Sequence, residues 1–384
     1  MQYFDYIISH YGWQGTSLAA VALVLFFVQL YYYIGAYGRI SSFRNSRRKK
    51  ILTSEPPISV IVPIFSEDYS YLDRLPLLLS QQYASTFEVV LVYVGRDTDY
   101  YDELTRQRLL YPNLSVTKIE FNPRFPISVK MALNVGIKSA RNEHIVITTT
   151  SAVPASEQWL AMMGKGFMRG DIVLGYTAIE ATEGLTNYIM RMSRLQCSLY
   201  WLAAAVNKQT FKGSRNNFGF TKSIYFAAKG FTHLNMNIGE EDLFIQRIAK
   251  RNNVSVALVP KATMIEHPWG GFKWWISELR HYGSAYAFYP IGARNRIEWD
   301  LGSQVLLFVT LLAMIILLPL ELKLAALALM LLRYLVVIMR IRSVAKRVGE
   351  KGVALRYFLF DLFNPILMLC VRVSLIKRDS TVWR

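Results

Sequence analysis

Three acidic side chains stand next to one another in the sequence, at Glu240, Glu241 and Asp242. Adjacent carboxylates repel one another, and this crowding raises the pKa of one of them, which suits it to accept a proton at neutral pH. Such a group can act as a general base, and Glu241 is our first candidate. The alternative is the solvated first turn of a helix, where acidic residues are stabilised by the helix dipole. The sequence leaves both interpretations open.

The segment that precedes this acidic run alternates between short β-branched stretches and helical stretches. Strands are predicted at residues 58–62, 88–94, 115–121 and 145–148, with helices at 72–82, 102–110 and 129–140. This alternation is typical of an α/β fold with parallel strands and right-handed crossovers. Ligands of such sheets bind beyond the carboxyl ends of the strands. The loops after residues 62, 92, 121 and 148 are therefore expected to form the binding site.

Three apolar runs are long enough to cross a bilayer, which takes about 20 residues. They cover residues 18–37, 305–320 and 322–339, and the last two are expected to form a tight helical hairpin around Pro319 and Glu321. No basic residue precedes the first run and no small-residue cleavage site follows it, so we interpret it as an uncleaved anchor rather than a signal peptide. We take these runs as nearly free of polar side chains, which disfavours a transporter or channel.

Basic residues follow the first and the third apolar run. One cluster lies at residues 39–50 and the other at 340–351. The positive-inside rule places both clusters in the cytoplasm, and with them the main domain of a multi-pass protein of the plasma (inner) membrane. Much of the formal net charge of +17 thus lies where it meets anionic lipid headgroups. A nucleic-acid partner is not expected.

The last apolar stretch, residues 357–376, is interrupted by Asp361, Asn364, Pro365 and Arg372. Ionisable groups are costly at mid-bilayer, so an interfacial or re-entrant helix is favoured over a further span. The expected organisation is a membrane anchor at 1–38, a basic linker at 39–56, a cytoplasmic domain at 57–300, a transmembrane hairpin at 301–340, and a basic loop with a C-terminal helix at 341–384.

The motifs of residues 57–285 resemble, in their order and spacing, those of the family 2 glycosyltransferases. The similar segments are Pro57 to Pro63 with Glu67, Gln81 to Tyr83 with Glu88 to Val92, Lys130 to Gly136, Pro154 with Trp159 and Leu160, Asn216 to Lys222 with Gly230 and Phe231, and Gly239 to Phe244. The resemblance implies a Rossmann-like, A-type glycosyltransferase domain between N- and C-terminal transmembrane helices. It also implies a nucleotide-sugar donor and inversion at the anomeric carbon. The membrane layout resembles that of polysaccharide and lipid-linked glycan synthases.

The resemblance assigns roles to particular positions of this chain. The acidic run at 240–242 takes the place of the catalytic base. The positions on the donor side are Pro63, Glu67, Tyr93, Lys130, Asn134, Thr149, Ser151, Arg280 and His281. The positions on the acceptor side are Asn216, Asn217, Trp274 and Trp275. For the two tryptophans, an interfacial helix remains the alternative to an acceptor-sugar platform.

Three donor-side motifs depart from the family pattern. Thr149-Thr150-Ser151 stands in place of the Asp-x-Asp that holds Mg²⁺ or Mn²⁺, so the ligands of the implied metal are missing. Tyr93-Val94-Gly95 replaces an acidic residue that contacts the nucleobase. Ser277 to His281 replaces Gln-x-x-Arg-Trp and keeps only the arginine, although His281 can still donate to a phosphate.

These departures leave two hypotheses on the function of the chain. In the first, the chain is an inverting glycosyltransferase that holds its donor with cations such as Lys130 and Arg280 and extends a lipid-linked or membrane-proximal glycan. In the second, it is an inactive scaffold subunit of a glycan-assembly complex with protein partners.

Overall fold

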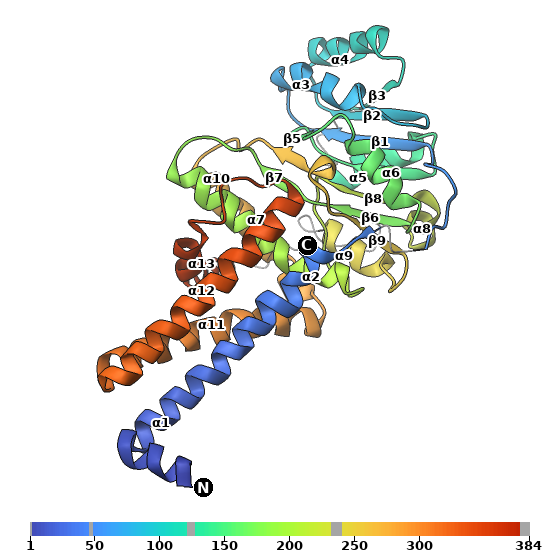
Figure 1. Cartoon of the computed structure of the whole chain (residues 1–384). Helices are drawn as coiled ribbons and strands as arrows, with labels where there is room; N and C mark the ends of the chain where they lie inside the picture. The colour runs from blue at the N-terminus through green and yellow to red at the C-terminus, as the bar shows by residue number, and fades with distance from the viewer. Residues whose placement is uncertain (1, 46–48, 121–126, 232–239, 377–384) are drawn as a thin grey trace.

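The computed structural model describes residues 2–45, 49–120, 127–231 and 240–376. An α/β domain lies at one end of the molecule, and long apolar helices extend from it in one direction (Figure 1). The mixed α/β fold class and the terminal apolar helices predicted from the sequence are confirmed.

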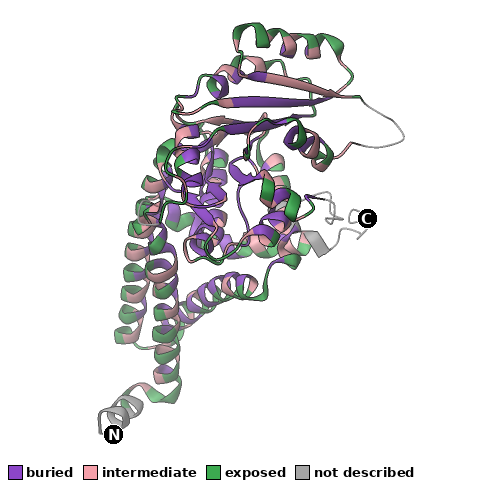
Figure 2. Ribbon diagram, turned by 90° about the vertical axis from the view of Figure 1, so that its right-hand side faces the viewer, coloured by how far each residue is buried: buried purple, intermediate pink, exposed green. Residues whose placement is uncertain are grey.

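The centre of the domain is a seven-stranded sheet with the order β3-β2-β1-β4-β8-β6-β9. Its strands are β1 Ile58–Ile64, β2 Phe87–Val94, β3 Leu114–Ile119, β4 His144–Ile147, β6 Ile172–Gly175, β8 Phe218–Thr221 and β9 Val254–Ala257. Strand β1 pairs in parallel with β2 on one side and with β4 on the other, as predicted. Strand β8 runs antiparallel to both of its neighbours. Buried apolar side chains on the two faces of this sheet form the domain core. Figure 2 shows buried residues along the strands of the sheet.

Helices cover the sheet, and a small second sheet lies beside its carboxyl edge. The helices are α3 Ser70–Leu79, α4 Thr98–Leu110, α5 Val129–Ser139, α6 Trp159–Phe167, α8 Lys222–Ala227 and α9 Glu240–Ile248. The small sheet has the order β5-β10-β7, with β5 Ala152–Pro154, β10 Met264–Glu266 and β7 Thr177–Ile179. Its strand β5 follows directly from β4 along the chain, so the small sheet shapes the predicted binding edge.

Strand β1 does not end at Pro63, where the sequence predicted its end, but continues to Ile64. A proline lacks the N–H group that a central strand needs on its hydrogen-bonded side. The carbonyl of Ile61 accepts from the Thr148 amide, so the backbone groups of Ile61 point toward β4. Pro63 is two residues further along the strand, so its nitrogen points to the same side. Because the β4 pairing ends at Ile61, the nitrogen of Pro63 faces no strand, and the proline is tolerated.

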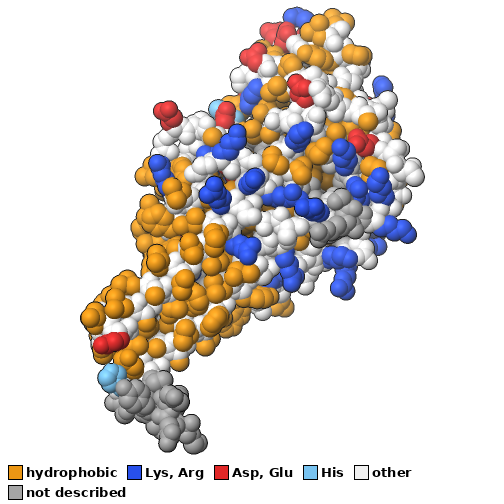
Figure 3. Space-filling model, viewed as in Figure 1, with side chains coloured by type: hydrophobic (Ala, Val, Ile, Leu, Met, Phe, Trp, Pro, Cys, Tyr) orange, Lys and Arg blue, Asp and Glu red, His pale blue; other side chains and the backbone are white. Residues whose placement is uncertain are grey.

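Four helices in the described part of the chain are long and apolar enough to cross a membrane. The first consists of α1 Gln2–Leu30, a π-helical segment Tyr31–Tyr37 and α2 Gly38–Ser42; the others are α11 Ile291–Leu317, α12 Leu320–Val348 and α13 Tyr357–Ile376. Helices α11 and α12 form the expected hairpin. On the face that Figure 3 shows, hydrophobic side chains cover these helices, and Lys and Arg gather on the adjoining part of the domain.

The apolar helices enclose a polar cluster, so our expectation that they contain almost no polar side chains is wrong. Arg333 on α12 is fully buried and pairs with Asp361 on α13 at 2.6 Å. Its guanidinium also donates to Gln29 on α1 at 2.8 Å. Gln29 in turn donates to Ser303 on α11, and Tyr37 donates to Asp300. The cluster thus ties all four apolar helices together.

Two helices connect the sheet with the apolar helices. Helix α7 Leu185–Val206 packs against α2, α13 and β7, and its Arg191 pairs with Glu350, which follows α12, at 2.7 Å. Helix α10 Phe272–Ser284 packs along α13. The domain and the apolar helices therefore share one continuous core, which includes side chains from both.

Candidate functional site

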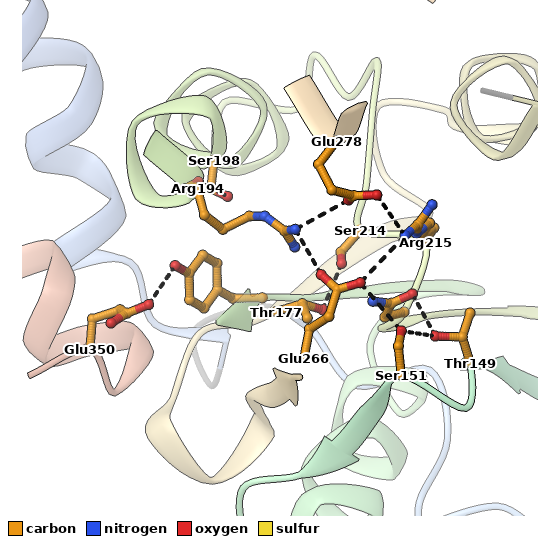
Figure 4. A network of polar contacts seen from close by, with 12 residues as sticks. Thr149, Ser151, Thr177, Arg194, Ser198, Ser214, Arg215, Glu266, Glu278 and Glu350 are labelled. Atoms are coloured by element: carbon orange, nitrogen blue, oxygen red, sulfur yellow. Dashed lines mark hydrogen bonds and ion pairs between the residues drawn. The ribbon is translucent and has the colours of Figure 1, made fainter. Parts of the chain in front are cut away.

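The predicted hydroxyl segment after β4 lies at the carboxyl edge of the sheet and faces polar side chains. Thr149 Oγ1 and Ser151 Oγ are 2.9 Å apart, and Thr149 donates to Asn216 Oδ1 at 3.0 Å (Figure 4). Ser151 donates to the Glu266 carboxylate at 3.3 Å. The strand-end rule therefore located this group of side chains, but Glu266 of β10 was not among the predicted residues.

Two arginines hold the buried Glu266 carboxylate. Arg194 of α7 approaches one carboxylate oxygen to 2.7 Å, and Arg215 approaches the other to 3.4 Å. Glu278 of α10 faces the same two guanidinium groups, at 3.4 Å from Arg194 and 3.1 Å from Arg215 (Figure 4). Two cations thus face two carboxylates, and the four-residue cluster carries no net charge.

Burial alone raises the pKa of Glu266, but the charges of Arg194 and Arg215 outweigh burial and lower this pKa to about 2. The folded-state pKa is below the unfolded value, so ionised Glu266 stabilises the fold above pH 4.5, and this stabilisation is lost as the pH falls toward 2. We therefore expect Glu266→Gln to lower the free energy of unfolding at neutral pH by about 3 kcal/mol. The difference from the parent protein should shrink as the pH falls from about 4.5 to about 2.

Thermal unfolding in detergent across this pH range measures the effect. Glu157→Gln is the matched control, because Glu157 is exposed on the same domain. Equal pH profiles for the parent and Glu266→Gln would contradict the assignment.

The side chains in the Asp-x-Asp position do not fit a divalent metal ion. Thr149 and Ser151 offer uncharged hydroxyls, whereas Mg²⁺ and Mn²⁺ prefer carboxylate oxygens. Within the described part of the chain, the carboxylate that reaches them is Glu266, which is already neutralised by two arginines. Among the described residues, no group of three or more His, Cys, Asp or Glu side chains could hold a metal ion.

Arg280 of α10, which we expected to bind the donor phosphates, does not contact the Thr149–Ser151 segment in the described structure. Arg280 Nε donates to Ser374 of α13 at 3.2 Å, so its guanidinium is engaged with the last apolar helix rather than with the Thr149–Ser151 segment. Glu278, two residues earlier, faces the site instead. The cation that the structure places beside Ser151 and Glu266 with partial exposure is Arg215, whose side chain is 33% exposed. The side chain of His281 lies outside the described residues.

Tyr93 closes part of the edge after β2. Its ring is fully buried, and its hydroxyl donates to Glu67 at 2.9 Å. Burial, followed by the hydrogen bond to Glu67, raises the pKa of Tyr93 well above its ordinary value, so it remains a neutral donor. The hydroxyl also lies over Gly95, where a Cβ atom would come within 2.1 Å of it. Only glycine at this position lets the loop fold over the tyrosine.

Other donor-side positions lie around this edge. Pro63 is buried within β1, and Lys130 is in the first turn of α5. Asn134, one turn further along α5, accepts from the Tyr225 hydroxyl at 3.3 Å.

The acidic run begins helix α9, and its members have different environments. Asp242 is buried, and one of its carboxylate oxygens accepts from both Lys212 and Tyr289. Burial raises the pKa of Asp242, and the charge of Lys212 opposes this shift. Glu241 is partly exposed, whereas the side chain of Glu240 lies outside the described residues. Asp242 thus anchors the helix, and Glu241 is the described carboxylate with access to solvent.

Lys212 links this helix to the rest of the site. It precedes the segment that carries Arg215 and Asn216, and its ion pair with Asp242 fixes that segment to the first turn of α9. The acidic run and the Thr149–Ser151 hydroxyls are therefore joined through one short, buried stretch of chain.

Two of the four expected acceptor positions have a structural role. Asn217 is fully buried, donates to the carbonyls of Tyr176 and Ala262 at 2.8 Å each, and accepts from Trp159. These bonds use both donors and the acceptor oxygen of its amide, which leaves them unavailable to a sugar. Trp275 is buried in an apolar cluster with side chains of α7 and α13, and Trp274 packs on the same cluster while partly exposed. Asn216 is buried and bonded to Thr149.

Comparison with solved protein structures shows which known fold this chain resembles. No protein-family model and no curated protein sequence matches the chain. The fold is nevertheless similar to that of a solved glycosyltransferase structure. The chain is similar to the solved structure of mannosyltransferase PcManGT from Pyrobaculum calidifontis in complex with GDP-Man and Mn²⁺, with a TM-score of 0.59 and 17% sequence identity. This similarity covers 94% of the present chain and 99% of that chain. A second solved structure, TarS 1-349 from S. aureus, matches with a TM-score of 0.42 and 15% identity, over 83% of this chain and 90% of that one.

Proposed function

We propose that this chain is a membrane-bound, inverting glycosyltransferase of the family 2 type that moves a sugar from a nucleotide-sugar donor to a lipid-linked or membrane-proximal glycan. The observation that carries the proposal is the similarity to a mannosyltransferase over almost the whole of both chains. That protein is described in complex with GDP-Man, which supports a nucleotide sugar as the donor here. The close packing of α7 and α10 on the apolar helices supports an acceptor held near the membrane.

In the proposed mechanism, Glu241 takes the proton of the acceptor hydroxyl. The acceptor oxygen then attacks the anomeric carbon, and the bond from that carbon to the nucleotide diphosphate breaks. The leaving diphosphate carries the negative charge, which must be offset by nearby cations. Because no metal site is present in the described residues, we assign this role to Arg215, whose partly exposed guanidinium would turn from Glu266 and Glu278 to the diphosphate, with Lys130 as a further candidate from the start of α5.

The chain is also proposed to be organised as the sequence suggested, with a cytoplasmic domain at 57–300 and the hairpin in the plasma (inner) membrane. Helix α13 is proposed to lie at the interface rather than to span. Near its start, the Asp361 carbonyl accepts from Gln304 of α11, and near its end Arg372 pairs with Glu298 of α11 at 2.6 Å. Both ends of α13 therefore meet the domain-side half of α11, which supports a helix that does not cross.

The proposed function predicts turnover that does not depend on a divalent ion. The purified protein in nanodiscs should release nucleotide diphosphate from one member of a panel of GDP and UDP sugars, at an equal rate with and without EDTA. Loss of activity in EDTA and its recovery with Mn²⁺ would show that carboxylates other than those described hold a metal. Absence of turnover together with no thermal shift on adding any nucleotide sugar would favour the alternative, an inactive scaffold of a glycan-assembly complex. The neutral, internally paired cluster around Glu266 is the observation that keeps this alternative in view.

A further inference from the structure

A hollow of about 410 Å³ lies on the domain, away from the candidate site. It is lined by Lys50, Thr53, Ser54, Glu55, Ala84, Lys165, Met168 and Arg169. Glu55 precedes β1, Ala84 precedes β2 and Arg169 precedes β6, and these three strands run in the same direction. The hollow is therefore at the amino edge of the sheet, opposite the edge that carries Thr149 and Ser151.

The wall that the linker contributes is held in place by backbone hydrogen bonds. The amides of Ile51 and Leu52 donate to the carbonyl of Met168, just after α6, at 2.7 and 3.3 Å. The Tyr83 hydroxyl donates to the carbonyl of Pro56, at the end of the same linker. The linker is thus docked on the domain, and the hollow is a built feature between it and the end of α6.

The charges around the hollow favour an anion. Lys50, Lys165 and Arg169 supply three cations against the one carboxylate of Glu55. Lys165 and Arg169 lie at the C-terminal end of α6 and offset the negative end of its dipole. The Arg169 guanidinium also donates to the Lys165 carbonyl at 3.0 Å. Lys50 belongs to the linker, so its positive charge has no role in stabilising the end of α6 and remains to attract an anion.

Two buried polar atoms in the walls lack a partner within the described part of the chain. They are Nε of Arg169, a donor, and Oε2 of Glu55, an acceptor. Buried polar groups are normally hydrogen-bonded, and an exception calls for an explanation such as a ligand or water. Both atoms are covered by the surrounding side chains, so a ligand bonds them only when Arg169 and Glu55 turn toward the hollow; such a ligand carries an anionic oxygen for the arginine and a hydroxyl group for the glutamate.

We propose that this hollow binds a phosphate ester with a neighbouring hydroxyl group, through Lys50, Lys165, Arg169 and Glu55. The Thr53 and Ser54 hydroxyls on its rim offer further hydrogen bonds to phosphate oxygens. Two sources share this chemistry, namely a soluble polyol phosphate and the headgroup of an anionic phospholipid. The site is separate from the proposed donor site, so its occupancy does not depend on glycosyl transfer.

The test uses the full-length protein in phosphatidylcholine nanodiscs, titrated calorimetrically with glycerol 3-phosphate. We expect binding to the parent that weakens about tenfold or more in Lys165→Ala/Arg169→Gln, because charge-assisted hydrogen bonds are lost. Lys138→Ala is the matched control, since Lys138 is an exposed lysine in the last turn of α5, as Lys165 is in α6. The control should bind as the parent does.

A second arm compares thermal stability in nanodiscs with and without phosphatidylglycerol. Stabilisation by this lipid that is lost in the double variant and kept in Lys138→Ala, without binding of glycerol 3-phosphate, identifies the lipid headgroup as the source. Equal weakening in the control and the double variant, or no response to either probe, would overturn the proposal. Nucleotide-sugar binding should be unchanged in the double variant, which keeps this result separate from the proposed transferase activity.

Discussion

Replacing Glu241 by glutamine is expected to lower the turnover number by about 100- to 10,000-fold while the protein remains folded. Glutamine has nearly the same shape but cannot accept the proton of the acceptor hydroxyl. Glu241 is partly exposed at the first turn of α9, so the substitution should cost little stability. Turnover of the active nucleotide sugar and thermal unfolding, measured on the same preparation, check both halves of this prediction.

The neighbouring Asp242→Asn variant is the matched control, because the structure gives Asp242 a different role. Its carboxylate forms a buried ion pair with Lys212, and removal of one partner from such a pair typically costs about 3–5 kcal/mol of stability. We expect this variant to unfold more easily. If Asp242→Asn instead keeps the parent's stability and loses turnover, while Glu241→Gln stays active, then Asp242 is the base.

The fold could be predicted from the sequence wherever the residue types of a single segment identified it as a strand or a helix. The stretch 88–94 is apolar and β-branched enough to identify a buried strand, and β2 is found at Phe87–Val94. Alternation with helices then predicted that β1, β2 and β4 are parallel, which the register of their pairing confirms. These patterns involve residues that are close together in the chain, so a single sequence is enough to detect them.

The candidate site was predictable only in part, because its charges come together from distant segments. Glu266 and Arg194 are 72 positions apart, and Arg215 is 51 positions from Glu266. No periodicity or motif signals that a charge on α7 will meet one on β10. The resemblance directed attention to Arg280, which the packing of α10 turns toward α13. A search for charged residues within otherwise apolar helical stretches would have found Arg194 together with Arg191.

The same limit explains the missed polar cluster among the apolar helices. One arginine lowers the mean hydropathy of a long run only slightly, and α12 is still long and apolar enough to cross a membrane. Its partner, Asp361, was noticed only as an interruption of the last apolar stretch. Neither residue alone reveals that the two form a pair, since their pairing depends on how α12 and α13 pack.

Arg333→Met is expected to lower the free energy of unfolding by about 3–5 kcal/mol, since it leaves Asp361 buried without its cationic partner. Arg333 lies 13 positions after Leu320, the first residue of α12, or about 20 Å along the helix, within the thickness of a bilayer's hydrocarbon core. The guanidinium also bonds Gln29 and lies 5.0 Å from the centre of the Phe308 ring. Its loss therefore loosens contacts among α1, α11, α12 and α13 together.

A double-variant cycle separates the ion pair from general damage to the helices. Arg333→Met and Asp361→Leu should each destabilise the protein in detergent unfolding, whereas the combined variant should be more stable than the sum of the two effects predicts, because it leaves no buried charge unpaired. Arg340→Met, on the same helix but partly exposed, is the control and should have little effect. Additive losses in the combined variant would mean that Arg333 and Asp361 act independently, and that Gln29 and the aromatic rings around Arg333, rather than Asp361, account for its contribution to the packing of the apolar helices.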